Sequence, residues 1–261
     1  MIKLNIGAAS CLVCENWDEI FSSGIYKPIV AILSSSASKA DAQQKILSFL
    51  LAGTDVDIPD SLIEATADKI CDQVYPLFDF IFNDVFIVNP IPYFYFKGRK
   101  FYGPSEKLLP QTGAEMEECA WAYFEYQKTG NEYFLNHLVA TLYRPSKFWT
   151  KAKDKRKAFS KLNVEDRANL FTDLEHLTKL GIKFFYENCE VWWKEEYKKL
   201  YEEGETSTDK VDSLGVSRLV RALAGQKRGT VEMVRLIDRD EIYFELIELN
   251  HEAEEAKEKT E

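Results

Sequence analysis

The spacing of apolar residues along the chain predicts a mainly helical protein. Residues 1–6 alternate apolar and polar side chains, which is the period of a short strand. Most of the remaining chain repeats apolar residues at intervals of three and four, as an amphipathic helix does. The predicted helical segments are residues 16–21, 26–33, 40–51, 59–77, 112–126, 134–142, 163–180, 184–201 and 214–224, a short helix from 231 and a last helix from 238. We therefore expect a multi-helix globular bundle with a short N-terminal strand.

Local signals mark where several helices begin and end. Thr112 is followed three residues later by Glu115, which is the spacing of a capping box. The turn at residues 129–131 then separates two helices that we expect to be antiparallel. Gly181 is expected to interrupt the long helical pattern that starts near Asn163.

Residues 93–102 depart from the helical period. Two aromatic runs flank the central sequence Lys97-Gly98-Arg99-Lys100, and the glycine suits a turn that needs a positive φ. This pattern predicts a small β-hairpin. Its aromatic residues are Tyr93, Phe94, Tyr95, Phe96, Phe101 and Tyr102.

The composition of residues 202–212 favours a linker, because this run is rich in Gly, Ser, Thr and acidic residues. We expect a helical main domain over 1–204 and a small helical C-terminal unit over 205–261. The tail from His251 has five acidic and two basic residues and no apolar face, so we expect it to fray.

The net charge limits the classes of partner. The 261 residues carry 33 Lys and Arg against 43 Asp and Glu, a formal charge of −10 and a sequence pI near 5.0. Such a chain is not a nucleic-acid binder that works by bulk positive charge. The hydrophobic fraction of 46% is ample for a core, so the chain is not a disordered tail.

The cysteines favour a reducing compartment. Five are present, an odd number scattered through a chain that is too large to need disulfides. Cys11 and Cys14 form a Cys-x-x-Cys, which is consistent with a redox pair, with half of a zinc site, or with two small residues that pack just before a helix. We favour the last interpretation, because no second ligand pair accompanies the motif.

No membrane span is expected. The most apolar stretch, residues 77–88, is broken by Asp79, Asn83 and Asp84 and is shorter than the roughly 20 residues that a membrane helix needs. The N-terminus lacks the pattern of a secretory signal. We expect a cytoplasmic protein.

Motifs for catalysis and for cofactors are missing from the sequence. It contains neither a phosphate-binding Gly-x-x-x-x-Gly-Lys-Ser/Thr loop nor a Gly-x-Ser-x-Gly elbow. Asp173 and His176 have a metal-ligand spacing, but a di-iron bundle needs a second pair and further carboxylates. His137 is expected to be a boundary residue of a helix. We therefore expect a non-enzymatic protein with no catalytic residue, no cofactor and no metal.

The segment 144–161 is basic within this acidic chain. It holds eight basic residues and one acidic residue, with Phe148, Trp149 and Phe159 between them. It suits nucleic-acid phosphates and bases, an acidic partner, or the acidic helices of the protein itself, and binding to nucleic acid is the least favoured of these. Its candidate contact residues are Lys147, Lys151, Lys153, Lys155, Arg156 and Lys157.

Several patches together resemble helical proteins encoded in the structural-gene modules of tailed phages and prophages. The C-terminal part is similar to small tail assembly chaperones, which end in an acidic tail. The resembling patches are Trp17 to Ile20, Tyr102 to Pro104, Leu142 to Pro145, the basic segment as far as Arg156 and Phe159, Leu223 to Gly225, Val234, and Glu241 to Leu246.

The resemblance implies a non-enzymatic assembly protein in the host cytoplasm. It implies a chaperone or adaptor that binds a tail tape-measure or tail-tube protein. The alternatives are a structural component of the virion and a nucleic-acid-binding protein. Aromatic residues dominate protein interfaces, so the candidate partner-binding residues are the six of the hairpin together with Trp192, Trp193 and Tyr197. The competing interpretation is that these side chains fill the core.

Overall fold

The computed structural model describes residues 2–6, 9–52, 74–147, 154–198, 200, 214–224 and 229–258. The chain divides into two compact units, residues 1–86 and 87–261, which are taken separately below. Most of the predicted helix over 59–77 and the predicted linker over 202–212 lie outside the described residues. The domain boundary at 204 and 205 therefore stays a prediction.

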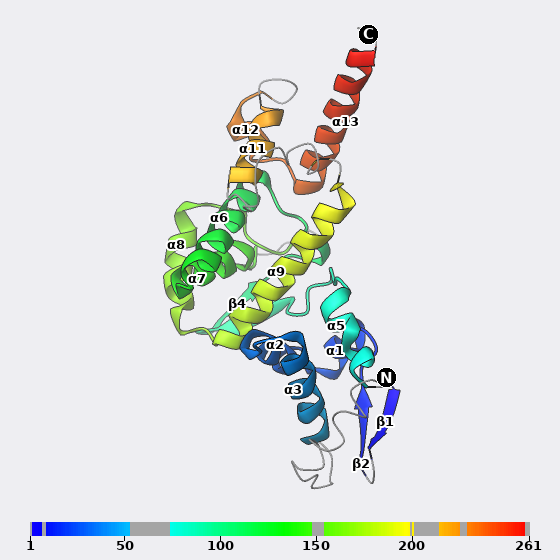
Figure 1. The fold of residues 1–261 in the computed structure, drawn as a ribbon. Coiled ribbons are helices and arrows are strands. Elements are labelled where there is room, and N and C mark those ends of the chain that lie inside the picture. The colour runs from blue at the N-terminus through cyan, green and yellow to red at the C-terminus, as the bar shows by residue number, and fades with distance from the viewer. Residues whose placement is uncertain are drawn as a thin grey trace. The chain divides into compact units, whose positions relative to one another are not determined.

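The N-terminal unit joins a β-hairpin to short helices (Figure 1). The predicted N-terminal strand is confirmed, but a second strand, which the sequence pattern missed, pairs with it antiparallel. Cys11 therefore lies in a strand, and only Cys14 directly precedes the first helix. The elements are β1 (Ile2–Ile6), β2 (Ala9–Val13), α1 (Trp17–Ser23), α2 (Tyr26–Ser35), α3 (Lys39–Ala52), the 3₁₀ turn η1 (Tyr75–Phe78) and α5 (Asp79–Asn83).

Helix α1 begins and ends where its sequence predicts. The Asn16 side chain accepts the Glu19 backbone N–H at 2.9 Å, and Gly24 ends the helix with a φ of 75°. The Trp17 ring packs on Phe86, with ring centroids 4.7 Å apart, and its Nε1 donates to the Asp84 carbonyl at 3.0 Å. These contacts form the core of the unit.

The C-terminal unit combines helices with one small sheet, and Figure 1 shows α6, α7 and α8 grouped together. Thr112 and Glu115 form the predicted capping box at the start of α6. The elements are β3 (Tyr93–Phe96), β4 (Arg99–Tyr102), η2 (Glu106–Leu108), α6 (Gly113–Thr129), α7 (Glu132–Leu142), β5 (Arg144–Pro145), α8 (Leu162–Leu170), η3 (Phe171–Asp173), α9 (His176–Glu196), α11 (Leu214–Leu223), α12 (Val231–Val234) and α13 (Arg239–Glu258). The expected fold class, mainly helical with a short N-terminal strand and an aromatic hairpin, is confirmed.

The C-terminal helices are tied to α6 and α9. The Gly113 and Ala114 backbone N–H groups, at the start of α6, donate to the Ile237 and Arg235 carbonyls at 3.0 Å. The buried Arg239 guanidinium donates to both carboxylate oxygens of Glu190, at 2.6 and 2.9 Å. The two backbone bonds satisfy donors that the start of α6 would leave unpaired, and the Arg239–Glu190 pair fixes α13 to α9.

One predicted helix boundary is wrong. Gly181 lies buried inside α9, and the long helical pattern breaks instead at residues 171–175, where Phe171 turns into the core. Leucines at helical spacing continue across this break, so the periodicity hides it. Helix α13 runs through Glu258, and its Ala and Glu residues are good helix formers, while the fraying of the tail from His251 stays a prediction. None of the helices in the described ranges is long and apolar enough to cross a membrane.

Candidate functional site

The aromatic hairpin and the basic segment meet in one three-stranded sheet. The strand order is β3-β4-β5, and β5, the first two residues of the basic segment, pairs with β4 through Tyr102 and Arg144. A two-residue turn joins β3 to β4, with a φ of 46° at Lys97 and 73° at Gly98. The predicted role of Gly98 is therefore confirmed.

One face of this sheet is part of the core. Phe94 and Phe101 stack with ring centroids 5.6 Å apart, and both contact Phe171. Phe94 also stacks on the buried Tyr143, and the half-buried Phe96 contacts Phe171. Phe101 is only 1% exposed, so it fills the core and does not reach a partner.

The opposite face carries three tyrosines and a lysine, and we call it the tyrosine face: Tyr93, Tyr95, Lys100 and Tyr102. Tyr93 and Tyr95 are 46% and 69% exposed. The Lys100 ammonium lies 3.6 Å from the Tyr93 ring centroid, 4.8 Å from that of Tyr102 and 5.4 Å from that of Tyr95. Lys155, from the basic segment, adds a second cation 5.9 Å from the Tyr102 ring. The result is an exposed aromatic surface with a positive centre.

The Lys100 ammonium stays charged on this face. Desolvation acts to lower its pKa, but the Tyr102 hydroxyl, with smaller contributions from Tyr95 and Tyr93, raises the pKa above its ordinary value of 10.5. This cation would repel positively charged groups of a partner and attract negatively charged ones.

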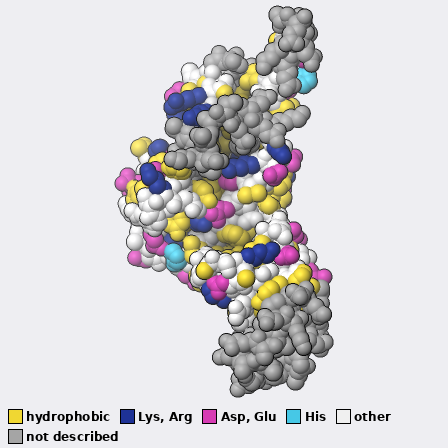
Figure 2. Space-filling view, in the orientation of Figure 1, with side chains coloured by type: hydrophobic (Ala, Val, Ile, Leu, Met, Phe, Trp, Pro, Cys, Tyr) yellow, Lys and Arg dark blue, Asp and Glu magenta, His cyan; other side chains and the backbone are white. Residues whose placement is uncertain are grey.

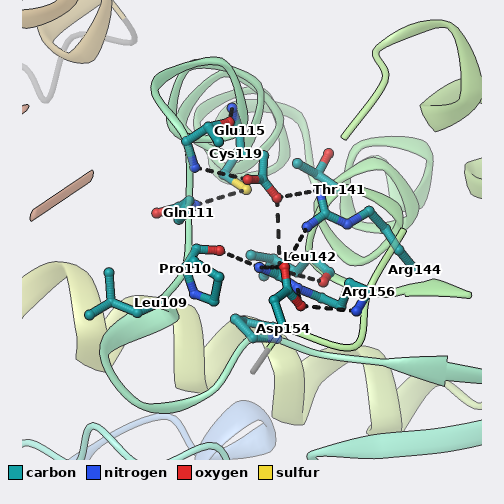
Figure 3. A network of polar contacts seen from close by, with 12 residues as sticks. Leu109, Pro110, Gln111, Glu115, Cys119, Thr141, Leu142, Arg144, Asp154 and Arg156 are labelled. Atoms are coloured by element: carbon teal, nitrogen blue, oxygen red, sulfur yellow. Dashed lines mark hydrogen bonds and ion pairs between the residues drawn. The ribbon is translucent and has the colours of Figure 1, made fainter. Parts of the chain in front are cut away.

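The arginines of the basic segment are buried in a polar network (Figure 3). Arg144 forms an ion pair with Glu115 of α6, and the Arg156 Nε donates to Asp154 at 3.0 Å. Arg156 also donates to the carbonyls of Leu142 and Pro110. Arg156 is 1% exposed, so this predicted contact residue holds the segment in place and is not available to a partner.

The lysines of the basic segment are distributed differently. Lys155 and Lys157 are exposed and Lys147 is half-buried, while Lys151 and Lys153 lie outside the described residues. Lys161 reaches Glu118 of α6 at 2.9 Å. Three cations of the segment, Arg144, Arg156 and Lys161, thus lie within 4 Å of carboxylates on the acidic helix α6.

The second aromatic cluster belongs mostly to the core. Trp193 is 1% exposed, its Nε1 donates to the Lys107 carbonyl at 2.9 Å, and its ring stacks on those of Tyr197 and Tyr243, which also contact each other. Trp192 is half-buried beneath the Lys107 ammonium, 4.1 Å from its ring centroid. Trp193 therefore serves the fold, and the structure does not bring this cluster together with the tyrosine face.

His137 lies in a polar cluster between α6 and α7. Its Nε2 is 3.0 Å from the Tyr133 hydroxyl, and its Nδ1 is 3.7 Å from Glu118. Burial acts to raise the pKa of Glu118, but contacts with His137 and Lys161 outweigh it and lower the pKa below its usual 4.5. Glu118 thus favours the folded state in its ionised form.

The contribution of Glu118 to stability is expected to depend on pH. Since the folded pKa is depressed, the contribution is present above the unfolded value of 4.5 and is lost as the pH falls through the folded pKa. Glu118→Gln should therefore lower the free energy of unfolding at about pH 6 and have a smaller effect at about pH 3. Urea titrations at both pH values measure this, and a difference that does not change with pH contradicts it.

Reactive thiols and a metal-binding cluster are the other chemical features to consider among the described residues. Burial raises the pKa of the Cys14, Cys119 and Cys189 thiols, which disfavours the reactive thiolate. Among the described residues, no group of three or more His, Cys, Asp and Glu side chains is placed to hold a metal ion. The Cys11 side chain lies outside what the structure describes.

Comparisons with known proteins found no match. No family model, no curated protein and no solved structure matches the chain.

The surface itself is mixed: Figure 2 shows hydrophobic side chains between cations and carboxylates on one face of the molecule.

The sequence pattern was not used to separate the buried aromatic residues of the hairpin from the exposed ones. All six hairpin aromatics were candidates, yet only Tyr93, Tyr95 and Tyr102 lie on the open face. The alternation of Tyr and Phe in β3 was the available signal, because successive side chains of a strand point to opposite faces. The position of Lys155 beside Tyr102 has no signal in the sequence.

Proposed function

We propose that this chain is a non-enzymatic assembly protein that binds a partner protein through the tyrosine face. The observation that carries the proposal is the exposure of Tyr93 and Tyr95 around the Lys100 cation, on a sheet whose other face is core. Exposed aromatic clusters with a cation mark protein interfaces more often than other surface does. The partner is expected to be acidic where it meets Lys100 and Lys155.

The resemblance to phage structural modules supplies the first partners to test. These are tail tape-measure and tail-tube proteins, with the chain acting as a tail assembly chaperone or adaptor. Binding of each purified partner can be measured by calorimetry. Replacing Tyr93 and Tyr95 together by Ser should weaken binding about tenfold or more, because central aromatic residues carry most of an interface's free energy.

The matched control changes exposed apolar residues elsewhere. Phe244 and Ile247 of α13 are 59% and 42% exposed, so their replacement by Ser alters a similar amount of surface. Binding should survive this change. Equal binding by the wild type and the double tyrosine variant would contradict the proposal.

Two further measurements address the alternatives. Mass spectrometry of purified phage particles should find the chain absent, whereas stoichiometric presence indicates a structural component of the virion. A labelled single-stranded oligonucleotide should show no saturable binding at about 0.15 M salt. Binding that falls steeply with salt and is lost when Lys155 and Lys157 are replaced by Glu would favour the nucleic-acid alternative. The burial of Arg144 and Arg156 argues against that alternative.

A further inference from the structure

Strand β3 lies at an edge of its sheet. In a two-residue hairpin the residues that flank the turn exchange hydrogen bonds, and paired and unpaired residues alternate from there. The Gly103 N–H donates to the Pro92 carbonyl at 3.0 Å, which fixes this alternation. Phe94 and Phe96 therefore pair with β4, and the backbone N–H and C=O groups of Tyr93 and Tyr95 point away from the sheet.

The residues of β3 carry neither of two common blocks to pairing, a charge or a proline. In the part of the chain that the structure describes, no strand lies beyond β3. Natural edge strands are blocked by charged residues, by proline or by a bulge. The sequence of β3 is Tyr-Phe-Tyr-Phe, with no charge and no proline inside it. The outward backbone groups of Tyr93 and Tyr95 thus lie beside the exposed tyrosine face.

We propose that β3 accepts an extended acidic segment of the partner as a fourth strand of the sheet. This inference rests on the proposed function and names how the tyrosine face is used. The backbone of the added strand would pair with Tyr93 and Tyr95, and its alternate side chains would lie beside the two tyrosine rings. Backbone hydrogen bonds supply affinity in this binding mode, and the side chains supply specificity.

Charge selects an acidic segment over a second copy of the chain. Lys100 lies on the same face as the two tyrosines, and Lys155 lies near Tyr102. Carboxylates on the added strand would reach these cations across the strands. Pairing of β3 with β3 of another copy would instead bring the cations of two tyrosine faces together, and like charges oppose association.

Hydrogen exchange at single amides tests the inference with a defined probe. The probe is a synthetic peptide of about ten residues that alternates Val and Glu, and its Val–Lys counterpart is the control. In the free chain, the Tyr93 and Tyr95 amides should exchange quickly and those of Phe94 and Phe96 slowly. Saturating Val–Glu peptide should slow exchange of the Tyr93 and Tyr95 amides about tenfold or more, and the Val–Lys peptide should not. Protection of these amides without any peptide would show that a second copy occupies the edge, and it would overturn the inference.

Two variants separate the edge from the side chains. Tyr95→Pro removes the outward N–H, while Tyr95→Thr removes the ring but keeps the N–H. The Pro variant should bind the Val–Glu peptide at least about tenfold more weakly than the Thr variant, with the Phe94 amide still protected as evidence of an intact hairpin. Absence of peptide binding to the wild-type chain, or equal binding by the two variants, overturns the inference. If tail proteins still bind the tyrosine face in that case, the proposed function is retained. If the peptide binds but the tail proteins do not, the strand-addition inference is retained and the named partners are wrong.

Discussion

Replacing Glu115 by Gln is expected to destabilise the protein by about 3–5 kcal/mol, because the change removes the closest carboxylate of the buried Arg144 guanidinium. Glu115 is 3% exposed, forms an ion pair with Arg144, and lies 3.8 Å from the Arg156 guanidinium. Gln keeps the size of the side chain and an oxygen that can accept the Thr112 N–H of the capping box. The variant therefore removes the charge and places the amide NH2 of Gln where the carboxylate accepted from Arg144. Urea unfolding of both proteins measures the loss.

Glu117 supplies the matched control two residues further along α6. It pairs with Arg235, whose side chain is 40% exposed, so Glu117→Gln should cost about 1 kcal/mol or less. The account of the buried network is contradicted if the two variants lose equal stability. The network bears on the proposed function because Arg144 begins β5, which pairs with β4 in the sheet that carries the tyrosine face.

Replacing Trp193 by Ala should lower the free energy of unfolding by about 3–5 kcal/mol, as for other fully buried large side chains. The ring stacks on Tyr197 and Tyr243, and the Arg239 guanidinium lies 4.7 Å from its centroid. Its loss removes one of the contacts that join α9 to α13, while the Arg239–Glu190 ion pair remains. The same change should leave partner binding by the remaining folded protein intact, since Trp193 is not on the tyrosine face.

The neighbouring Trp192 shows what a half-buried residue of the same type contributes. Trp192 is half-buried and contacts the Lys107 ammonium, so Trp192→Ala should cost about 1 kcal/mol or less. Thermal or urea unfolding of the pair distinguishes core from surface. If Trp192→Ala proves as destabilising as Trp193→Ala, the assignment of Trp193 to the core is wrong.

Local signals in the sequence predicted much of the fold. The capping pair Thr112 and Glu115 and the turn glycine Gly98 each act within a few residues, so a single stretch of sequence contains the whole signal. The break at residues 171–175 could not be predicted in this way. It depends on Phe171 packing against Phe94 and Phe101, which lie about seventy residues earlier in the chain.

The candidate site was predicted in its composition but not in its geometry. The aromatic hairpin was identified, whereas the burial of Phe101 and Arg156 depends on residues distant in sequence. Glu115 is the clearest case: it lies on α6, and the basic segment it helps to neutralise begins at Arg144. The sequence of a charged segment gives its net charge, but the fold determines which of its charged side chains are buried.

The central claim is that the tyrosine face is the surface that meets the partner. Tyrosine-selective modification of the chain, read residue by residue with and without the purified tape-measure or tail-tube protein, tests it most directly. The account predicts that Tyr93 and Tyr95 react readily in the free chain and are protected in the complex, while the half-exposed Tyr133 of α7 reacts equally in both. A complex in which Tyr93 and Tyr95 react as fast as in the free chain would contradict the claim.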